Sequence, residues 1–246
     1  MDQAPRRAAL SSFPVLVIAG RQPALPGKYE LMQLPFTHDQ FLDVFGAYNR
    51  ALWPAAILIW LLTAAAIATL YRRGPRASRL VAAVLAFHWG WAGFAYHLAF
   101  FRSINPAATL FGAVFVLQAA LFLWRGALRS QLSFQPTSSI WGRVGGALIV
   151  YALLYPGLGL ALGLAYPRFP SFGVPCPTAI LTVGLLLLAP RREVRLLSAI
   201  PVLWAAVGGS AAVLLNIRTD FALLVAGPLL MVFAVAGSRR PNLRAA

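Results

Sequence analysis

Long apolar stretches separated by short polar or basic connections are the main pattern of this chain. They lie at residues 52–71, 80–101, 106–124, 142–165, 177–190, 196–215 and 220–237. About 18–20 apolar residues in a helix span the hydrocarbon layer of a membrane, and a helix satisfies its own backbone hydrogen bonds there. The pattern therefore predicts an all-α, polytopic transmembrane helix bundle with about seven spans. The fourth stretch contains Pro156, where we expect a kink.

A shorter amphipathic segment at residues 32–51 precedes the first span. Thr37 and Gln40 have the spacing of a helix capping box, and Asp39 lies in the first turn, where it complements the helix dipole. The apolar residues that follow form a stripe typical of a helix lying on a membrane interface. We expect this interfacial helix to lead into a seven-helix membrane domain at 52–237 and a basic tail at 238–246.

Composition supports the membrane interpretation and weakens the alternative that net charge suggests. Hydrophobic residues make up 60% of the chain and charged residues 11%, whereas soluble domains have roughly 25% charged residues. The net charge of +15 would suit a nucleic-acid-binding protein. However, the basic residues stand singly or in small groups between apolar stretches, as loop charges of membrane proteins do. We therefore expect a lipid bilayer, and no nucleic acid, as the partner.

The basic residues alternate between rich and poor connections. The poor connections have one arginine each, Arg102, Arg168 and Arg218. Because basic residues accumulate on the cytoplasmic side, the sequence predicts a cytoplasmic C-terminus and an outside N-terminus. Arginine in place of lysine is typical of a GC-rich bacterial genome, which indicates a multi-pass protein of the bacterial cytoplasmic (inner) membrane. The rich connections and the tail contain Arg72, Arg73, Arg76, Arg79, Arg125, Arg129, Arg143, Arg191, Arg192, Arg195, Arg239, Arg240 and Arg244.

Residues 1–31 fit this orientation poorly because they place basic side chains outside. One explanation is a cleavable signal, with Arg6 and Arg7 before an apolar stretch and a cleavage site after Ala19. The other is that translation naturally starts at Met32 rather than Met1, so that 1–31 is an extension. We favour the start at Met32.

Few side chains in the predicted spans could support chemistry. No Asp, Glu or Lys lies deep in a span, which argues against a proton pump, and no hydrolase or phosphate-binding motif is present. The sequence therefore favours a non-enzymatic protein and leaves the cofactor unknown. His88 and His97 share the second span, and nine residues at 100° each place them on opposite sides of a helix. Either each histidine packs against a neighbouring helix, or it contacts a ligand or metal; His88, His97 and Cys176 are weak metal candidates.

Polar residues gather at the predicted outer ends of the spans. The alternative to a binding site is that they are helix caps and turns. If a site for a small ligand exists, we expect it to open outward. The candidate ligand-binding residues are Asp39, Tyr48, Asn49, His97, Arg102, Asn105 and Cys176.

A set of short segments carries a resemblance to a known family. The segments are Leu34-Pro35-Phe36-Thr37, Gln40-Phe41-Leu42, Val44-Phe45, Tyr48-Asn49, Trp53-Pro54, Tyr96-His97, Phe100-Phe101, Ile104-Asn105-Pro106-Ala107, Leu110-Phe111-Gly112, Phe172-Gly173-Val174, Cys176-Pro177-Thr178, Ile200-Pro201, Trp204 and Gly208-Gly209-Ser210-Ala211-Ala212. Together, over residues 32–237, they resemble a bacterial family of multi-spanning membrane proteins known only as a domain of unknown function. Members of that family are similar in starting near Met32, which supports a start at that residue. The resemblance implies a membrane location, but no activity, substrate or site residue.

Three functions stay open at this level. The first is a protein that binds or passes a small ligand from an outward-facing site. The second is an accessory or assembly subunit of a larger membrane complex, with a membrane-protein partner or as a homo-oligomer. The third is a metal- or haem-binding membrane protein, which we rank last because no two of the His and Cys residues share a motif spacing.

Overall fold

The computed structural model describes residues 34–72 and 74–236, which form seven α-helices and no strand. The predicted all-α fold is therefore confirmed, and each α-helix overlaps one predicted stretch. The proposed extension at 1–31 and the basic tail at 238–246 lie outside the described residues. The helices are α1 (His38–Thr69), α2 (Pro75–Trp91), α3 (Ala108–Leu121), α4 (Ile140–Ala161), α5 (Pro175–Leu186), α6 (Arg191–Leu214) and α7 (Ala222–Ala236).

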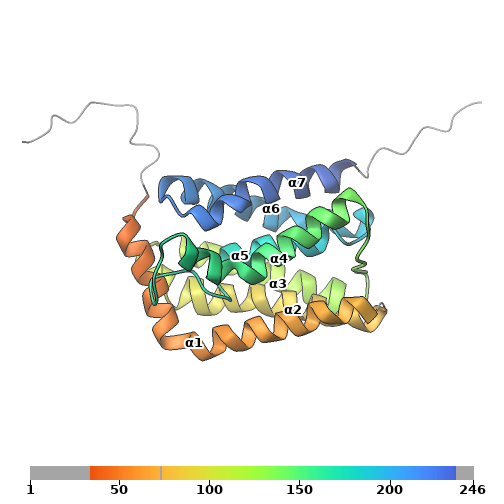
Figure 1. Cartoon of the computed structure of the whole chain (residues 1–246), viewed down its shortest axis with the longest axis horizontal. Helices are drawn as coiled ribbons and strands as arrows, with labels where there is room; N and C mark the ends of the chain where they lie inside the picture. The colour runs from red at the N-terminus through yellow and green to blue at the C-terminus, as the bar shows by residue number, and fades with distance from the viewer. Residues whose placement is uncertain (1–33, 73, 237–246) are drawn as a thin grey trace, which may run out of the picture. The chain divides into compact units, whose positions relative to one another are not determined.

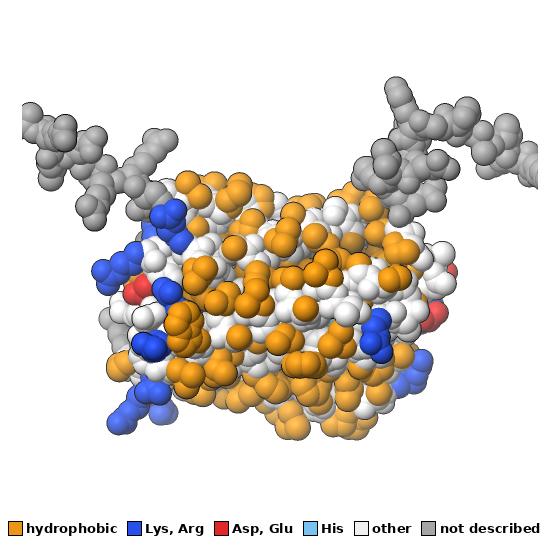
Figure 2. Space-filling model, turned by 180° about the vertical axis from the view of Figure 1, so that it is seen from behind, with side chains coloured by type: hydrophobic (Ala, Val, Ile, Leu, Met, Phe, Trp, Pro, Cys, Tyr) orange, Lys and Arg blue, Asp and Glu red, His pale blue; other side chains and the backbone are white. Residues whose placement is uncertain are grey.

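Five helical segments are long and apolar enough to cross a membrane: His38–Arg72, Ala108–Leu128, Ile140–Ala161, Arg191–Leu214 and Arg218–Ala236. The helix α5 is apolar but has only 12 residues, so at 1.5 Å per residue it is shorter than a hydrocarbon core of roughly 30 Å. Figure 2 shows a broad hydrophobic band on the face in view, with charged side chains gathered at the two ends.

The helix α1 has two parts that meet at Leu52, whose backbone dihedrals are not helical. The second part runs alongside the other helices, whereas the first part crosses their ends (Figure 1). We call this end of the bundle, which includes the connections 99–107, 162–174 and 215–221, the capped end. The opposite end includes the connections after α1, α3 and α5, and we call it the arginine-rich end.

The first part of α1 begins with the predicted capping box. The Thr37 side chain accepts a hydrogen bond from the Gln40 backbone amide, and the Gln40 side chain accepts one from the amide of Thr37. The apolar stripe that follows, including Phe41 and Phe45, is buried. It packs against residues of the capped end such as Phe101. The stripe that the sequence predicts for a membrane interface thus covers the protein itself.

Two helices continue as π-helices: α2 as η3 (Ala92–Leu98) and α3 as η5 (Phe122–Leu128). The amide of Ala99 bonds to the carbonyl of Phe94, five residues earlier. A π-turn changes the phase of the side chains that follow it, so a straight α-helix over 80–101 misplaces residues beyond 92. Short 3₁₀ segments complete the described structure: η2 (Leu70–Arg72), η4 (Phe101–Ser103) and η6 (Arg218–Phe221).

The short helix α5 is central, and every one of its residues is buried (Figure 1). It packs closely on α4, where Gly145 faces Gly184. A Cβ atom added at Gly184 would lie 2.8 Å from the Gly145 carbonyl oxygen, which is too close for any side chain. Close backbone approach at small residues is the usual way in which helices pack in membranes, and here it fixes the position of the α5 side chains described below.

Candidate functional site

A cavity of about 160 Å³ lies under the first part of α1 at the capped end. We call it the capped-end pocket. Its walls are apolar or aromatic, except for a few polar side chains from different elements. The lining residues are Leu34, Phe36, Phe41, Phe45, Tyr96, His97, Phe101, Asn105, Phe111, Val174, Pro175, Cys176, Trp204, Val207, Gly208, Ser210, Ala211, Ala212, Leu214, Ile217 and Asp220.

The polar residues of this pocket lie at or near the ends of helices. His97 lies in the π-helical segment η3, and Asn105 lies just before α3. Cys176 follows Pro175 at the N-terminus of α5, where a proline lacks no required hydrogen bond. Asp220 lies in η6, immediately before α7. Three of the residues predicted to contact a ligand, His97, Asn105 and Cys176, are thus brought together.

His97 is the most unusual residue of the pocket. Its side chain is fully buried, and neither ring nitrogen has a hydrogen-bond partner within residues 34–72 and 74–236. Its ring makes edge contacts with aromatic residues on two other helices, with centroid separations of 4.7 Å to Phe115 and 5.2 Å to Trp204. A buried polar group without a partner is unfavourable by about 1–3 kcal/mol. A water or ligand that bonds to the imidazole would remove this cost.

Asp220 and Trp204 add two more such groups to the same pocket. Asp220 is 2% exposed, and its Oδ1 atom has no hydrogen-bond partner among the described residues. The buried indole nitrogen Nε1 of Trp204 lies beside the Cys176 thiol and has no other partner in the described part of the chain. Asn105, in contrast, accepts a hydrogen bond from the Ala107 amide. The pocket therefore combines apolar walls with an imidazole, an indole N–H and a carboxyl group whose hydrogen-bonding capacity the described protein residues leave unused.

The other predicted ligand-binding residues have structural contacts elsewhere. The Tyr48 hydroxyl donates to the Phe172 carbonyl and accepts from the Trp91 indole. Asn49 donates to two backbone carbonyls of the 162–174 connection, those of Pro167 and Phe169. Both side chains hold that connection against α1. For these two residues, the interpretation as caps and turns describes the contacts better than the interpretation as ligand-binding residues.

The two charged candidates lie at the surface of the capped end. Asp39 pairs with Arg168 at 2.8 Å, and Asp43 pairs with the same guanidinium at 2.9 Å. These ion pairs tie the first part of α1 to the 162–174 connection. Arg102 is exposed and does not line the capped-end pocket.

His88 is in a different environment from His97. Its Nε2 atom lies 2.6 Å from the Thr63 hydroxyl on α1, and its Nδ1 atom lies 3.4 Å from the Thr178 hydroxyl on α5. His97 instead faces α3 and α6, so the two histidines point to different helices. Among the described residues no three His, Cys, Asp or Glu side chains gather as metal ligands would. His97 and Cys176 share a pocket, and His88 does not line it.

Asp220 and Trp204 were not among the ligand-binding candidates predicted from the sequence, although Trp204 lies in a segment that resembles the family. Asp220 falls at the start of the last predicted span, where an acidic residue usually caps a helix in water. In the structure it is buried, and it lines the capped-end pocket together with residues of the first part of α1. The sequence signal that could have identified Asp220 is a pair of adjacent polar residues, Thr219 and Asp220, immediately before an apolar helix. Both residues are buried in the structure.

Comparison with known proteins gives one match. A family model described as "Family of unknown function (DUF6064)" matches residues 38–245. No curated protein and no protein of solved structure matches the chain. The matched range includes all seven α-helices and all the polar residues of the capped-end pocket.

Proposed function

We propose that this chain, which belongs to the Family of unknown function (DUF6064), is a multi-pass protein of the bacterial inner membrane that binds a small molecule in the capped-end pocket. Five helices long and apolar enough to cross a membrane support the membrane location. The predominance of arginine over lysine supports a bacterial source. The polar groups of the pocket support the binding role.

The single observation that carries the binding proposal is His97. A neutral imidazole has one donor and one acceptor nitrogen, and both are buried here without a protein partner. Evolution usually removes such groups from an interior unless they have a role, because each one is unfavourable to folding. A bound molecule with one acceptor and one donor would satisfy both ring nitrogens.

The walls of the pocket support one chemical class for this molecule. A cavity of about 160 Å³ compares with the ~150 Å³ of a cavity that binds benzene in another protein. The rings of Phe111 and Trp204 make T-shaped contacts with the imidazole of His97. Asp220 offers a carboxyl group on the same pocket. We therefore propose a ligand of about the size of one aromatic ring, mainly apolar, with a hydrogen-bonding group directed at His97 and Asp220.

The orientation follows from the arginine pattern. Positive charges on the cytoplasmic side would place the arginine-rich end in the cytoplasm and the capped-end pocket at the outer surface. Beyond His97, the fully buried side chains of Phe115 and Trp89 pack against each other at 4.4 Å. A closed core behind the imidazole supports binding from one side rather than passage through the bundle.

The experiment compares the small molecules that co-purify with wild-type protein and with two pocket variants, His97→Phe and Asp220→Asn. Each protein is purified from its native membrane in mild detergent, and extracts are compared by mass spectrometry. A surface variant, Leu58→Ala, is the control because Leu58 is 65% exposed on α1. We expect one compound that is near-stoichiometric in wild type and control and depleted in both pocket variants. Identical extracts from all four proteins would mean that the pocket contains only water.

A further inference from the structure

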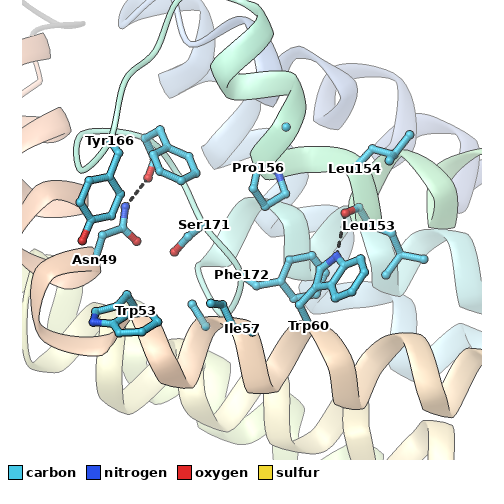
Figure 3. A pocket seen from close by; sticks show the side chains of 13 residues that line it. Asn49, Trp53, Ile57, Trp60, Leu153, Leu154, Pro156, Tyr166, Ser171 and Phe172 are labelled. Carbon is cyan, nitrogen blue, oxygen red and sulfur yellow. Dashed lines mark hydrogen bonds between the residues drawn. The ribbon is translucent and has the colours of Figure 1, made fainter.

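A second, larger hollow lies on the side of the bundle, between the second part of α1 and α4 (Figure 3). Its volume is about 530 Å³, within the range of roughly 300–1,000 Å³ typical of small-molecule sites. We call it the lateral groove. The connection 162–174 closes one end. The lining residues are Asn49, Trp53, Ala56, Ile57, Trp60, Leu153, Leu154, Pro156, Gly157, Tyr166, Phe169, Ser171 and Phe172.

The lateral groove opens through the apolar surface of the bundle. Large apolar residues at its rim are more than half exposed, including Ile57 at 51% and Leu154 at 56%. In a membrane, this surface contacts hydrocarbon and not water. A groove of this size left empty would lose dispersion contacts along its whole length. Acyl chains are the material in contact with such a surface.

One end of the lateral groove has features of the membrane–water interface. Trp53 and Tyr166 lie on its rim and are 54% and 60% exposed, and such residues concentrate where acyl chains join the headgroups. The Ser171 hydroxyl lies at the same end. It is buried, has no hydrogen-bond partner in the part of the chain that the structure describes, and is directed toward Asn49 and Trp53 (Figure 3). A lipid ester carbonyl is an acceptor found at this depth.

Two polar side chains of the groove are already bonded within the protein. The Trp60 indole donates to the Leu153 carbonyl at 2.8 Å, one turn before Pro156 (Figure 3). The Asn49 amide donates to the carbonyls of Pro167 and Phe169. Away from the end that holds Trp53, Tyr166 and Ser171, the side chains of the groove therefore offer apolar contact. This combination fits one long hydrocarbon chain with a hydrogen-bond acceptor at one end.

We infer that the lateral groove is a binding site for one phospholipid, with an acyl chain lying between α1 and α4 from Trp53 to Trp60 and its ester carbonyl accepting a hydrogen bond from Ser171. From Trp53 to Trp60 a helix rises roughly 10 Å, so the groove contacts the upper part of a chain. The inference rests on the proposed membrane location but not on the capped-end pocket, which is lined by other residues.

Two glycines of α4 provide a matched test. A Cβ atom added at Gly157, which lines the lateral groove, meets nothing within 4 Å, and the same is true of Gly146, which does not line it. Gly157→Phe therefore fills the groove, whereas Gly146→Phe adds the same side chain elsewhere on the helix. Ser171→Ala removes the hydroxyl and leaves the groove open, so it stays informative if Gly157→Phe fails to fold.

The experiment uses the full-length chain reconstituted in nanodiscs of phosphatidylcholine and phosphatidylglycerol, then released into mild detergent for native mass spectrometry. We expect one retained phospholipid per chain for wild type and Gly146→Phe, and none for Gly157→Phe. Ser171→Ala should lower retention by roughly two- to tenfold, as loss of one hydrogen bond does.

Equal lipid retention by all four proteins, or none by wild type, would overturn the inference. A dimer that dissociates on Gly157→Phe, with no retained lipid, would also overturn it, because a second copy of the chain would then cover the groove. Depletion of a small compound from the His97→Phe variant tests the capped-end pocket separately and leaves this result unchanged.

Discussion

Two buried histidines, His88 on α2 and His97 on η3, lie along one helical segment, and the polar groups around them differ in whether their hydrogen bonds are made. In the last turn of α2, His88 contacts Thr63 and Thr178, and the Trp89 indole donates to Thr182. At the capped end, His97, Asp220 and Trp204 have polar atoms without hydrogen-bond partners among the described residues. Both histidines are buried, but they face different helices.

The difference separates a structural role from a binding role. The atoms around His88 are satisfied by side chains on three helices, so this group stabilises packing and needs no other molecule. The polar atoms around His97 would be satisfied by a molecule that enters the pocket. Since folding disfavours unpaired buried groups, the presence of several of them in one cavity supports the binding role that we propose for it.

The largest loss of stability is expected from a substitution at the contact between α4 and α5, because it disturbs both groups of polar side chains at once. Gly184→Leu places atoms against the Gly145 carbonyl and pushes α5, which includes Thr178 and Cys176, away from its partners. Overpacking of this kind destabilises by ~1–3 kcal/mol or more. Thermal unfolding in detergent micelles should show a lower midpoint and loss of the co-purified compound. The open position Gly146→Leu is the control and should unfold near wild type.

A smaller loss of stability is expected when one hydrogen bond is removed from the group of polar side chains around His88. Thr182→Val preserves the shape of the side chain but leaves the Trp89 indole N–H without an acceptor. Interhelical hydrogen bonds in membrane proteins contribute about 0.6 kcal/mol on average and up to about 1.7. We expect a loss of stability in that range and full retention of the compound. An unchanged unfolding midpoint would show that this group contributes little to packing.

A variant of the polar group at the capped end should keep its stability and lose the co-purified compound. Asp220→Asn keeps a polar side chain of similar size and removes a carboxyl group whose Oδ1 makes no bond within the protein. We expect a change in stability of less than ~1 kcal/mol, because no protein hydrogen bond of that atom is lost, together with depletion of the compound in mass spectrometry. Strong destabilisation would instead assign Asp220 to the structural group.

The smallest loss of stability is expected from a substitution at the surface of the capped end. Asp43→Asn breaks one of the two ion pairs of Arg168, while Asp39 still holds the guanidinium. Exposed ion pairs contribute roughly 0.2–1 kcal/mol. Unfolding should therefore shift slightly, and compound retention should persist. Loss of the compound in Asp43→Asn would show that these ion pairs control access to the pocket.

Much of the fold could be predicted from the sequence, because apolar stretches of this length form helices wherever they lie. The capping box at Thr37 and Gln40 was also readable, since it depends on residues three positions apart. The two π-segments were not, because a wider turn leaves no mark in the hydrophobic pattern. One of them contains His97, and the other directly follows α3.

The candidate site could be predicted only in part. His97, Asn105 and Cys176 were identified as polar or reactive residues at the ends of apolar stretches, and all three line the pocket. Tyr48 and Asn49 were identified by the same criterion, but they hold the 162–174 connection. Whether a side chain finds a partner depends on contacts between residues more than a hundred positions apart, and no local pattern encodes them.

The most direct measurement applies one substitution, His→Phe, at both histidines and records the thermal unfolding midpoint and the co-purified compound of each variant. We expect His88→Phe to unfold at lower temperature, by the ~1–2 kcal/mol of two interhelical hydrogen bonds, and to retain the compound. We expect His97→Phe to be as stable as wild type or more so, since it removes two unpaired groups, and to lose the compound. A destabilised His97→Phe that still retains the compound would contradict the assignment of His97 to binding and place both histidines in packing.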